Sequence, residues 1–124
     1  MIKRAIYDEA QRVLKRTQSH DPYDIMDALG IIYIPVTDFV ELKGMYKSEW
    51  RRHFVFVNAN IPPRVQRMVM LHEIGHHVLH REDACVFQEF ELYNMVSEKE
   101  LEANIFASAI LLADADVYGY AREG

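Results

Sequence analysis

The spacing of hydrophobic residues changes along this 124-residue chain and divides it into helical and extended segments. Apolar residues recur every three or four positions over residues 2–17, which predicts an amphipathic helix. A short second helix is expected over about 22–29. Asp21 can cap its start, Pro22 suits its first turn and Gly30 suits its end. The chain is therefore predicted to begin with two helices.

Three runs rich in β-branched and aromatic residues follow, at 31–36, 42–48 and 53–57. The third run, His-Phe-Val-Phe-Val, is the clearest strand. Helical spacing then returns over about 63–80, where it follows a pair of prolines. These segments predict an α+β fold with a three-stranded sheet.

The C-terminal part is expected to contain one more helix. Residues 81–96 show no consistent period and are expected to be irregular or partly helical. A helix is predicted over about 98–113, followed by a polar tail. The chain is thus expected to form a single domain over residues 1–124, with its core at about 22–113.

The most informative segment is His72-Glu73-Ile74-Gly75-His76, which has the form H-E-x-x-H. Two histidines four residues apart on a helix differ by about 40° in direction and lie about 6 Å apart, so both can reach one metal ion. The glutamate between them is suited to take a proton from a metal-bound water. The face that carries the histidines also carries Val65, Met68, Val69 and Leu79. The motif predicts a zinc-dependent hydrolase whose histidines lie at the floor of a cleft and not on open surface.

A catalytic zinc site takes three protein ligands, and the third is less evident. His77 points to another face of the helix. His80 would lie about 12 Å along a straight helix from the first histidine, so both are interpreted as structural or surface residues. Glu100 and Glu102 on the final helix are the better candidates. Ser97 and Glu100 also form a capping-box pattern, which gives Glu100 a competing role at the helix start.

Two segments together resemble the ImmA/IrrE family of metallopeptidases. Residues 72–80 read H-E-I-G-H-H-V-L-H and match H-E-x-G-H-x-x-x-H. Residues 100–107 read E-L-E-A-N-I-F-A and match E-x-x-A-N-x-F-A. The likeness extends to about residues 25–112. One departure is Leu-Leu-Ala-Asp at 111–114, where the family often has Leu-Leu-Met-Pro.

The resemblance implies a zincin-like fold and a set of site residues. His72 and His76 would bind Zn²⁺, Glu100 would be the third ligand and Glu73 the general base. Mn²⁺ and Fe²⁺ are alternatives for the same donors. A donor to the tetrahedral intermediate would also be needed, and Tyr46 and His53 are weak candidates for it.

Composition indicates which partners and which cellular location to expect. The formal charge of −5 argues against direct nucleic-acid binding. The single cysteine, Cys85, excludes an internal disulfide and suits a reducing compartment. No signal peptide or membrane-spanning run is evident. A cytoplasmic protein is expected.

The leading hypothesis is a zinc endopeptidase. The resemblance implies that its substrate is a regulatory protein, typically a helix-turn-helix repressor of a phage or mobile element. It also implies the short type of family member that carries no helix-turn-helix domain of its own. The alternative is an antirepressor or toxin–antitoxin partner that acts by binding without cleavage.

Overall fold

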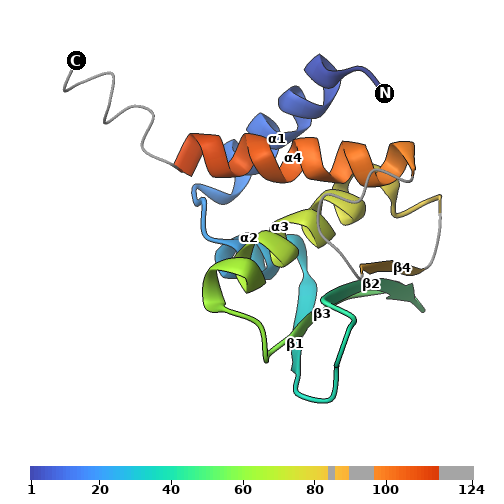
Figure 1. The fold of residues 1–124 in the computed structure, drawn as a ribbon. Helices are drawn as coiled ribbons and strands as arrows, with labels where there is room; N and C mark the ends of the chain where they lie inside the picture. Colours follow the sequence, from blue (N-terminus) through green and yellow to red (C-terminus); the bar gives the residue numbers. More distant parts are fainter. Residues whose placement is uncertain (84–85, 90–96, 115–124) are drawn as a thin grey trace.

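A computed structural model describes residues 1–83, 86–89 and 97–114. Figure 1 shows helices stacked on one face of a sheet, with the third helix between the sheet and the last helix. The elements in chain order are α1 (Lys3–Thr17), α2 (Pro22–Leu29), β1 (Ile31–Val36), β2 (Gly44–Glu49), β3 (Arg52–Asn58), α3 (Pro63–His80), β4 (Val86–Glu89) and α4 (Glu98–Asp114). This α+β architecture confirms the predicted fold class.

Local chemistry sets the short helix α2. The Asp21 carboxylate accepts a hydrogen bond of 2.9 Å from the backbone N–H of Tyr23. Gly30 ends the helix with φ of 72°, a left-handed conformation that glycine adopts without a steric cost. The predicted bounds of this helix are confirmed at both ends.

The sheet has four strands in the order β1-β3-β2-β4. Strands β1 and β3 are parallel, whereas β2 pairs antiparallel with both β3 and β4. All three predicted strands are present. Strand β3 is paired on both sides, so it offers no open edge to another strand.

The prediction of a three-stranded sheet and an irregular or helical segment at 86–89 was wrong. Residues Val86–Glu89 form β4, in register with β2 from Lys47 opposite Val86 to Gly44 opposite Glu89. Four residues are too few to show a strand period. Their conformation comes from cross-strand hydrogen bonds to β2, which residue spacing along the chain does not report.

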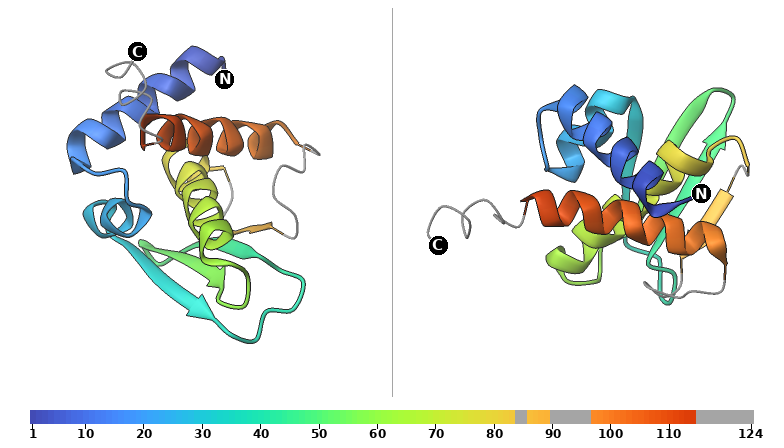
Figure 2. Two further views of the ribbon diagram at one scale, coloured as in Figure 1. Left: turned by 60° about the vertical axis from the view of Figure 1, so that its left-hand side comes forward. Right: turned by 90° about the horizontal axis from the view of Figure 1, so that it is seen from above.

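Helix α3 is the centre of the molecule and is buried from Val69 to His77. It packs on β2 and β3 on one side and crosses α4 on the other (Figure 2). Gly75 lies at this crossing, because a Cβ there would stand 3.1 Å from the carbonyl oxygen of Ala103. The absence of a side chain lets the two helices approach closely enough to share a site.

Within the described part of the chain, no helix has both the length and the apolar character needed to cross a membrane. Cys85 and the expected tail beyond residue 114 lie outside the described residues.

Candidate metal centre

Two histidines of α3 and one glutamate of α4 converge where these two helices cross. Nε2 of His72 lies 2.9 Å from Oε1 of Glu100, and Nε2 of His76 lies 3.2 Å from the same oxygen. The imidazole rings are 4.8 Å apart between centroids. Nitrogen and carboxylate donors aimed at one point form a donor set that fits a divalent transition metal.

Glu73 lies beside the two histidines in the same buried group. Ligand atoms of His72, Glu73 and His76 all lie within 4.8 Å of one another, and these three residues are 2%, 0% and 0% exposed. Their burial confirms the expectation that the motif lies away from open surface. On distance alone, either Glu73 or Glu100 could complete a three-ligand set with the histidines.

The start of α4 shows where the Glu100 side chain points. The backbone N–H of Glu100 donates a hydrogen bond of 3.1 Å to Oγ of Ser97, so the serine half of the capping box is formed. The Glu100 carboxylate instead lies against the imidazoles of His72 and His76. Ser97 therefore starts the helix while Glu100 points into the centre.

Asn104 orients His72 from one turn further along α4. Its Oδ1 lies 2.6 Å from Nδ1 of His72, and the amide oxygen accepts from the ring N–H. A neutral imidazole that carries its hydrogen on Nδ1 has its lone pair on Nε2. Asn104 thus presents the His72 lone pair to the point where Glu100 lies.

A buried chain of hydrogen bonds orients His76 in the same way. Nδ1 of His76 lies 3.0 Å from Nδ1 of His80, and Nε2 of His80 lies 2.7 Å from Oε1 of Glu102. Oε2 of Glu102 lies 2.9 Å from the amino group of Met1. This chain joins both helices on the side of His76 opposite to its contact with Glu100.

The directions of the pKa shifts of Glu102 and His80 favour one set of hydrogen positions in this chain. Burial raises the pKa of Glu102, but hydrogen bonds from the Met1 amino group and from His80 outweigh it and leave that pKa below its ordinary value. Burial lowers the pKa of His80 against the raising effect of Glu102, so its ring is neutral at pH 7. The ionised Glu102 accepts from Nε2–H of His80, whose Nδ1 must then accept from Nδ1–H of His76. The Nε2 lone pair of His76 is left facing the centre.

Strand β4 supplies the aromatic wall of the centre. The Phe87 ring stacks on His76 with centroids 3.9 Å apart and an angle of 6° between planes. It also contacts the His80 ring at 5.8 Å. The sequence did not point to Phe87, because its strand carries no recognisable period.

Tyr46 and His53, the weak candidates for an intermediate-stabilising donor, face another side of α3. The Tyr46 hydroxyl lies 2.9 Å from Nδ1 of His53 and 2.9 Å from Nδ1 of His77. Burial, then His53 and then Arg81 lower the pKa of His77 to about 4, and burial raises the pKa of Tyr46 to about 12. His77 is turned by about 100° from His76 around the helix axis, so this cluster faces away from the candidate centre.

Comparison with known proteins agrees with this arrangement. The family model described as the IrrE N-terminal-like domain of the M78 peptidases matches residues 29–124, which include His72, Glu73, His76 and Glu100. The chain belongs to the ImmA/IrrE family. The family resemblance of residues 72–80 and 100–107 is confirmed. These two ImmA/IrrE segments meet at the α3–α4 crossing.

Two relatives of this ImmA/IrrE family member are similar over most of the chain. An uncharacterized immunity region protein 2 of Bacillus phage phi105 is 32% identical over 120 residues, which cover 97% of this chain and 73% of the phage protein. Metallopeptidase ImmA of Bacillus subtilis (strain 168) is 27% identical over 114 residues, which cover 90% of this chain and 65% of that protein. The chain is thus shorter than both relatives.

The departure from the ImmA/IrrE pattern lies at the far end of α4. Leu111 to Asp114 begin two turns beyond Asn104, about 10 Å along the helix. The described donor groups of the candidate centre all come from residues N-terminal to this segment.

Proposed function

We propose that this protein is a metal-dependent endopeptidase in which His72, His76 and Glu100 hold Zn²⁺ and Glu73 is the general base. The observation that carries the proposal is the convergence of both Nε2 atoms on one Glu100 oxygen, at 2.9 and 3.2 Å. Two histidines and one carboxylate are a usual ligand set of catalytic zinc, which keeps a position for water. Bound zinc would supply Lewis-acid activation of that water and of the substrate carbonyl.

Proton transfer in the proposed reaction is assigned to Glu73. Glu73 is fully buried beside the histidines, where its carboxylate can accept a proton from the attacking water. It then returns that proton to the nitrogen of the leaving amine. Its motif position and the reach of Glu100 from α4 favour Glu100 as ligand and Glu73 as base, although both carboxylates lie near the histidines.

Glu73 is held in place by the close approach of β2 to α3. A Cβ on Gly44 would lie 2.3 Å from Cγ1 of Val69 and 3.0 Å from Oε2 of Glu73. Only glycine fits at this position without displacing a neighbour. The start of β2 therefore forms a backbone wall against the general base.

Asn104 and the His80–Glu102 pair serve as positioning residues. Each holds one metal-binding imidazole in the tautomer whose Nε2 lone pair faces the ion, so the site is organised before the metal binds. All three side chains are buried, which protects these hydrogen bonds from competition with water.

The proposed substrate is a regulatory protein, with a helix-turn-helix repressor of a phage or mobile element as the specific candidate. The names of the two relatives support this setting, since one is an immunity region protein of a phage and the other a metallopeptidase. The location proposed for this reaction is the cytoplasm, where such repressors act.

The test uses the purified chain with Zn²⁺ and a candidate substrate, a helix-turn-helix repressor of a phage or mobile element. The wild type should cleave the repressor at a defined bond, whereas Glu73→Gln should bind Zn²⁺ with unchanged stoichiometry and lose cleavage by at least about a hundredfold. Glu49→Gln is the matched control, because Glu49 is exposed on β2 and pairs with Lys47.

Two results would contradict the proposal. Cleavage by Glu73→Gln at the wild-type rate would remove Glu73 from the chemistry. Relief of repression by Glu73→Gln without any cleavage would instead favour the alternative in which the protein acts by binding the repressor.

A further inference from the structure

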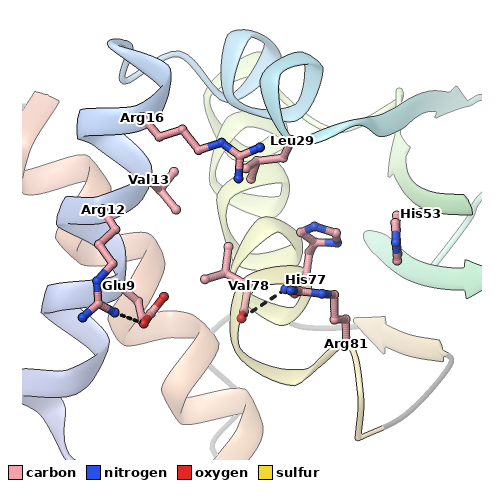
Figure 3. Close-up of a pocket in the computed structure, with 9 residues that line it drawn as sticks. All are labelled: Glu9, Arg12, Val13, Arg16, Leu29, His53, His77, Val78 and Arg81. Atoms are coloured by element: carbon pink, nitrogen blue, oxygen red, sulfur yellow. Dashed lines mark hydrogen bonds and ion pairs between the residues drawn. The ribbon is translucent and has the colours of Figure 1, made fainter. Parts of the chain in front are cut away.

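A polar cavity lies on the side of α3 that faces away from the metal centre. It has a volume of about 580 Å³ and opens between α1, α3 and β3, as Figure 3 shows. This volume is in the range of small-molecule sites. Its polar lining consists of Glu9, Arg12, Arg16, His53, His77 and Arg81.

The lining of this cavity is positively charged although the whole chain carries a net charge of −5. Three arginines face one carboxylate, and that carboxylate, Glu9, is already paired with Arg12. With neutral histidines the lining has two net positive charges. No described residue is ion-paired with Arg16 or Arg81, so their charges are not compensated within the described part of the chain.

The Arg81 guanidinium forms a hydrogen bond within the protein and keeps other N–H donors for a ligand. Arg81 directly follows the last residue of α3, and its Nη1 donates a hydrogen bond of 2.8 Å to the carbonyl oxygen of His77 (Figure 3). A guanidinium has five N–H donors in a rigid plane. The carbonyl contact fixes the plane, and the remaining donors can bind an oxyanion in a bidentate manner.

The buried side chain of His77 offers the cavity a further hydrogen-bond donor. Only 7% of the residue is exposed, and its Nδ1 is bonded to the Tyr46 hydroxyl at 2.9 Å. Among the described residues none is hydrogen-bonded to its Nε2, although the residue lines the cavity. A buried imidazole with one ring nitrogen held and the other unpartnered is suited to a ligand.

The shared hydroxyl couples the hydrogen positions of His53 and His77. Tyr46 has one hydroxyl hydrogen and contacts Nδ1 of both His53 and His77, so it donates to one ring and accepts from the other. When His53 donates to Tyr46 and Tyr46 donates to His77, the His77 hydrogen is on Nε2. The opposite direction satisfies the same two contacts with the His77 hydrogen on Nδ1, so an anion that accepts from Nε2–H selects the first arrangement.

We propose that this cavity binds a phosphate group, held by Arg16, Arg81 and Nε2–H of His77. A phosphate monoester carries close to two negative charges at pH 7 and three acceptor oxygens, which match the net charge and the donors of the lining. The cavity is larger than a free phosphate, so it has room for a small organic phosphate as well as for the inorganic ion. This site uses none of the metal-binding residues and does not depend on the proposed peptidase activity.

The test titrates the full chain with inorganic phosphate and with glycerol phosphate at constant ionic strength set with NaCl. Binding is followed by calorimetry and by the ¹⁵N signal of the His77 imidazole, which is assigned by its loss in His77→Gln. Saturable binding is expected, with the His77 signal moving in step. Tighter binding of glycerol phosphate would identify the organic phosphate as the better ligand, and equal binding would identify the phosphate group alone.

Arg16→Gln and Arg81→Gln should each weaken phosphate binding about tenfold or more, because a charge-assisted hydrogen bond is lost. Arg4→Gln, on the exposed start of α1, removes the same charge outside the cavity and should leave binding within about twofold of the wild type. Arg16 is at the surface end of α1, so its replacement tests the site without disturbing the core.

The proposal is overturned if phosphate has no effect beyond that of NaCl. Equal affinity in the wild type, Arg16→Gln and Arg81→Gln would also overturn it, because phosphate would then bind elsewhere, for example at an added metal ion.

Discussion

Nδ1 of His76 lies 3.0 Å from Nδ1 of His80, one helical turn further along α3. Two donors cannot face each other in a neutral pair, so one ring must accept. The Glu102 carboxylate takes the hydrogen on the far side of His80 and so makes His80 the acceptor. His80 is therefore tied to the candidate centre although it lies too far along the helix to share its metal.

The first prediction concerns His80. His80→Phe removes the acceptor that fixes the His76 tautomer, and Zn²⁺ affinity should fall about 10- to 100-fold, as is typical for groups behind a metal ligand. Chelator competition measures the affinity. His20→Phe, a substitution of the same kind in the loop before α2, should leave it unchanged. Equal affinities in all three proteins would remove the positioning role from His80.

Asn104 provides a second prediction that separates orientation from packing. Asn104→Leu removes the acceptor at Nδ1 of His72 and should weaken Zn²⁺ binding about 10- to 100-fold. Asn104→Asp keeps an oxygen at the same place and should retain affinity near that of the wild type. The long-range ¹H–¹⁵N spectrum of the metal-free protein should show His72 protonated on Nδ1 in the wild type and in Asn104→Asp. A mixture of tautomers in the wild type would contradict this account.

Gly75 gives a prediction about the helix crossing. Alanine favours a helix by about 1 kcal/mol over glycine, but the added Cβ would meet Ala103 backbone atoms at 3.1 and 3.2 Å. Crowding against backbone costs about 1–3 kcal/mol. Gly75→Ala should therefore lower the free energy of unfolding by about 1 kcal/mol in urea denaturation, and it should weaken Zn²⁺ binding as α4 and Glu100 move.

Gly30→Ala is the control for this effect. A Cβ there has nothing within 4 Å, but the φ of 72° strains any residue with a side chain. Gly30→Ala should therefore lower the free energy of unfolding without changing Zn²⁺ affinity. If Gly75→Ala lowers stability but leaves Zn²⁺ affinity unchanged, the crossing does not position the Glu100 carboxylate for the proposed metal.

The fourth prediction concerns His53, whose pKa is lowered first by burial and then by the charge of Arg81. Arg81→Gln should raise the pKa of His53 in an NMR titration, whereas Arg4→Gln should not. A folded-state pKa below the unfolded value means that the unfolded chain binds more protons in this range. The contribution of His53 to stability is thus complete above its ordinary pKa and is lost as the pH falls toward the folded value. A pKa of His53 that does not respond to Arg81→Gln would show that burial alone causes the shift.

Much of the architecture follows from local chemistry. Helical spacing predicted α1, α3 and α4, the Asp21 cap and Gly30 fixed α2, and β-branched runs predicted three strands. Strand β4 was missed because four residues show no period and need β2 as a partner. Because this strand was not predicted, Phe87 was not among the candidate residues.

The sequence by itself determined the pair His72 and His76, because a spacing of four on a helix fixes their relative direction before any packing occurs. Only the tertiary structure decided where the Glu100 carboxylate lies. The crossing of α3 and α4 at Gly75 brings its carboxylate to both imidazoles and leaves Ser97 to cap the helix. Contacts between residues far apart in the chain depend on where whole helices lie, and residue spacing carries no information about that.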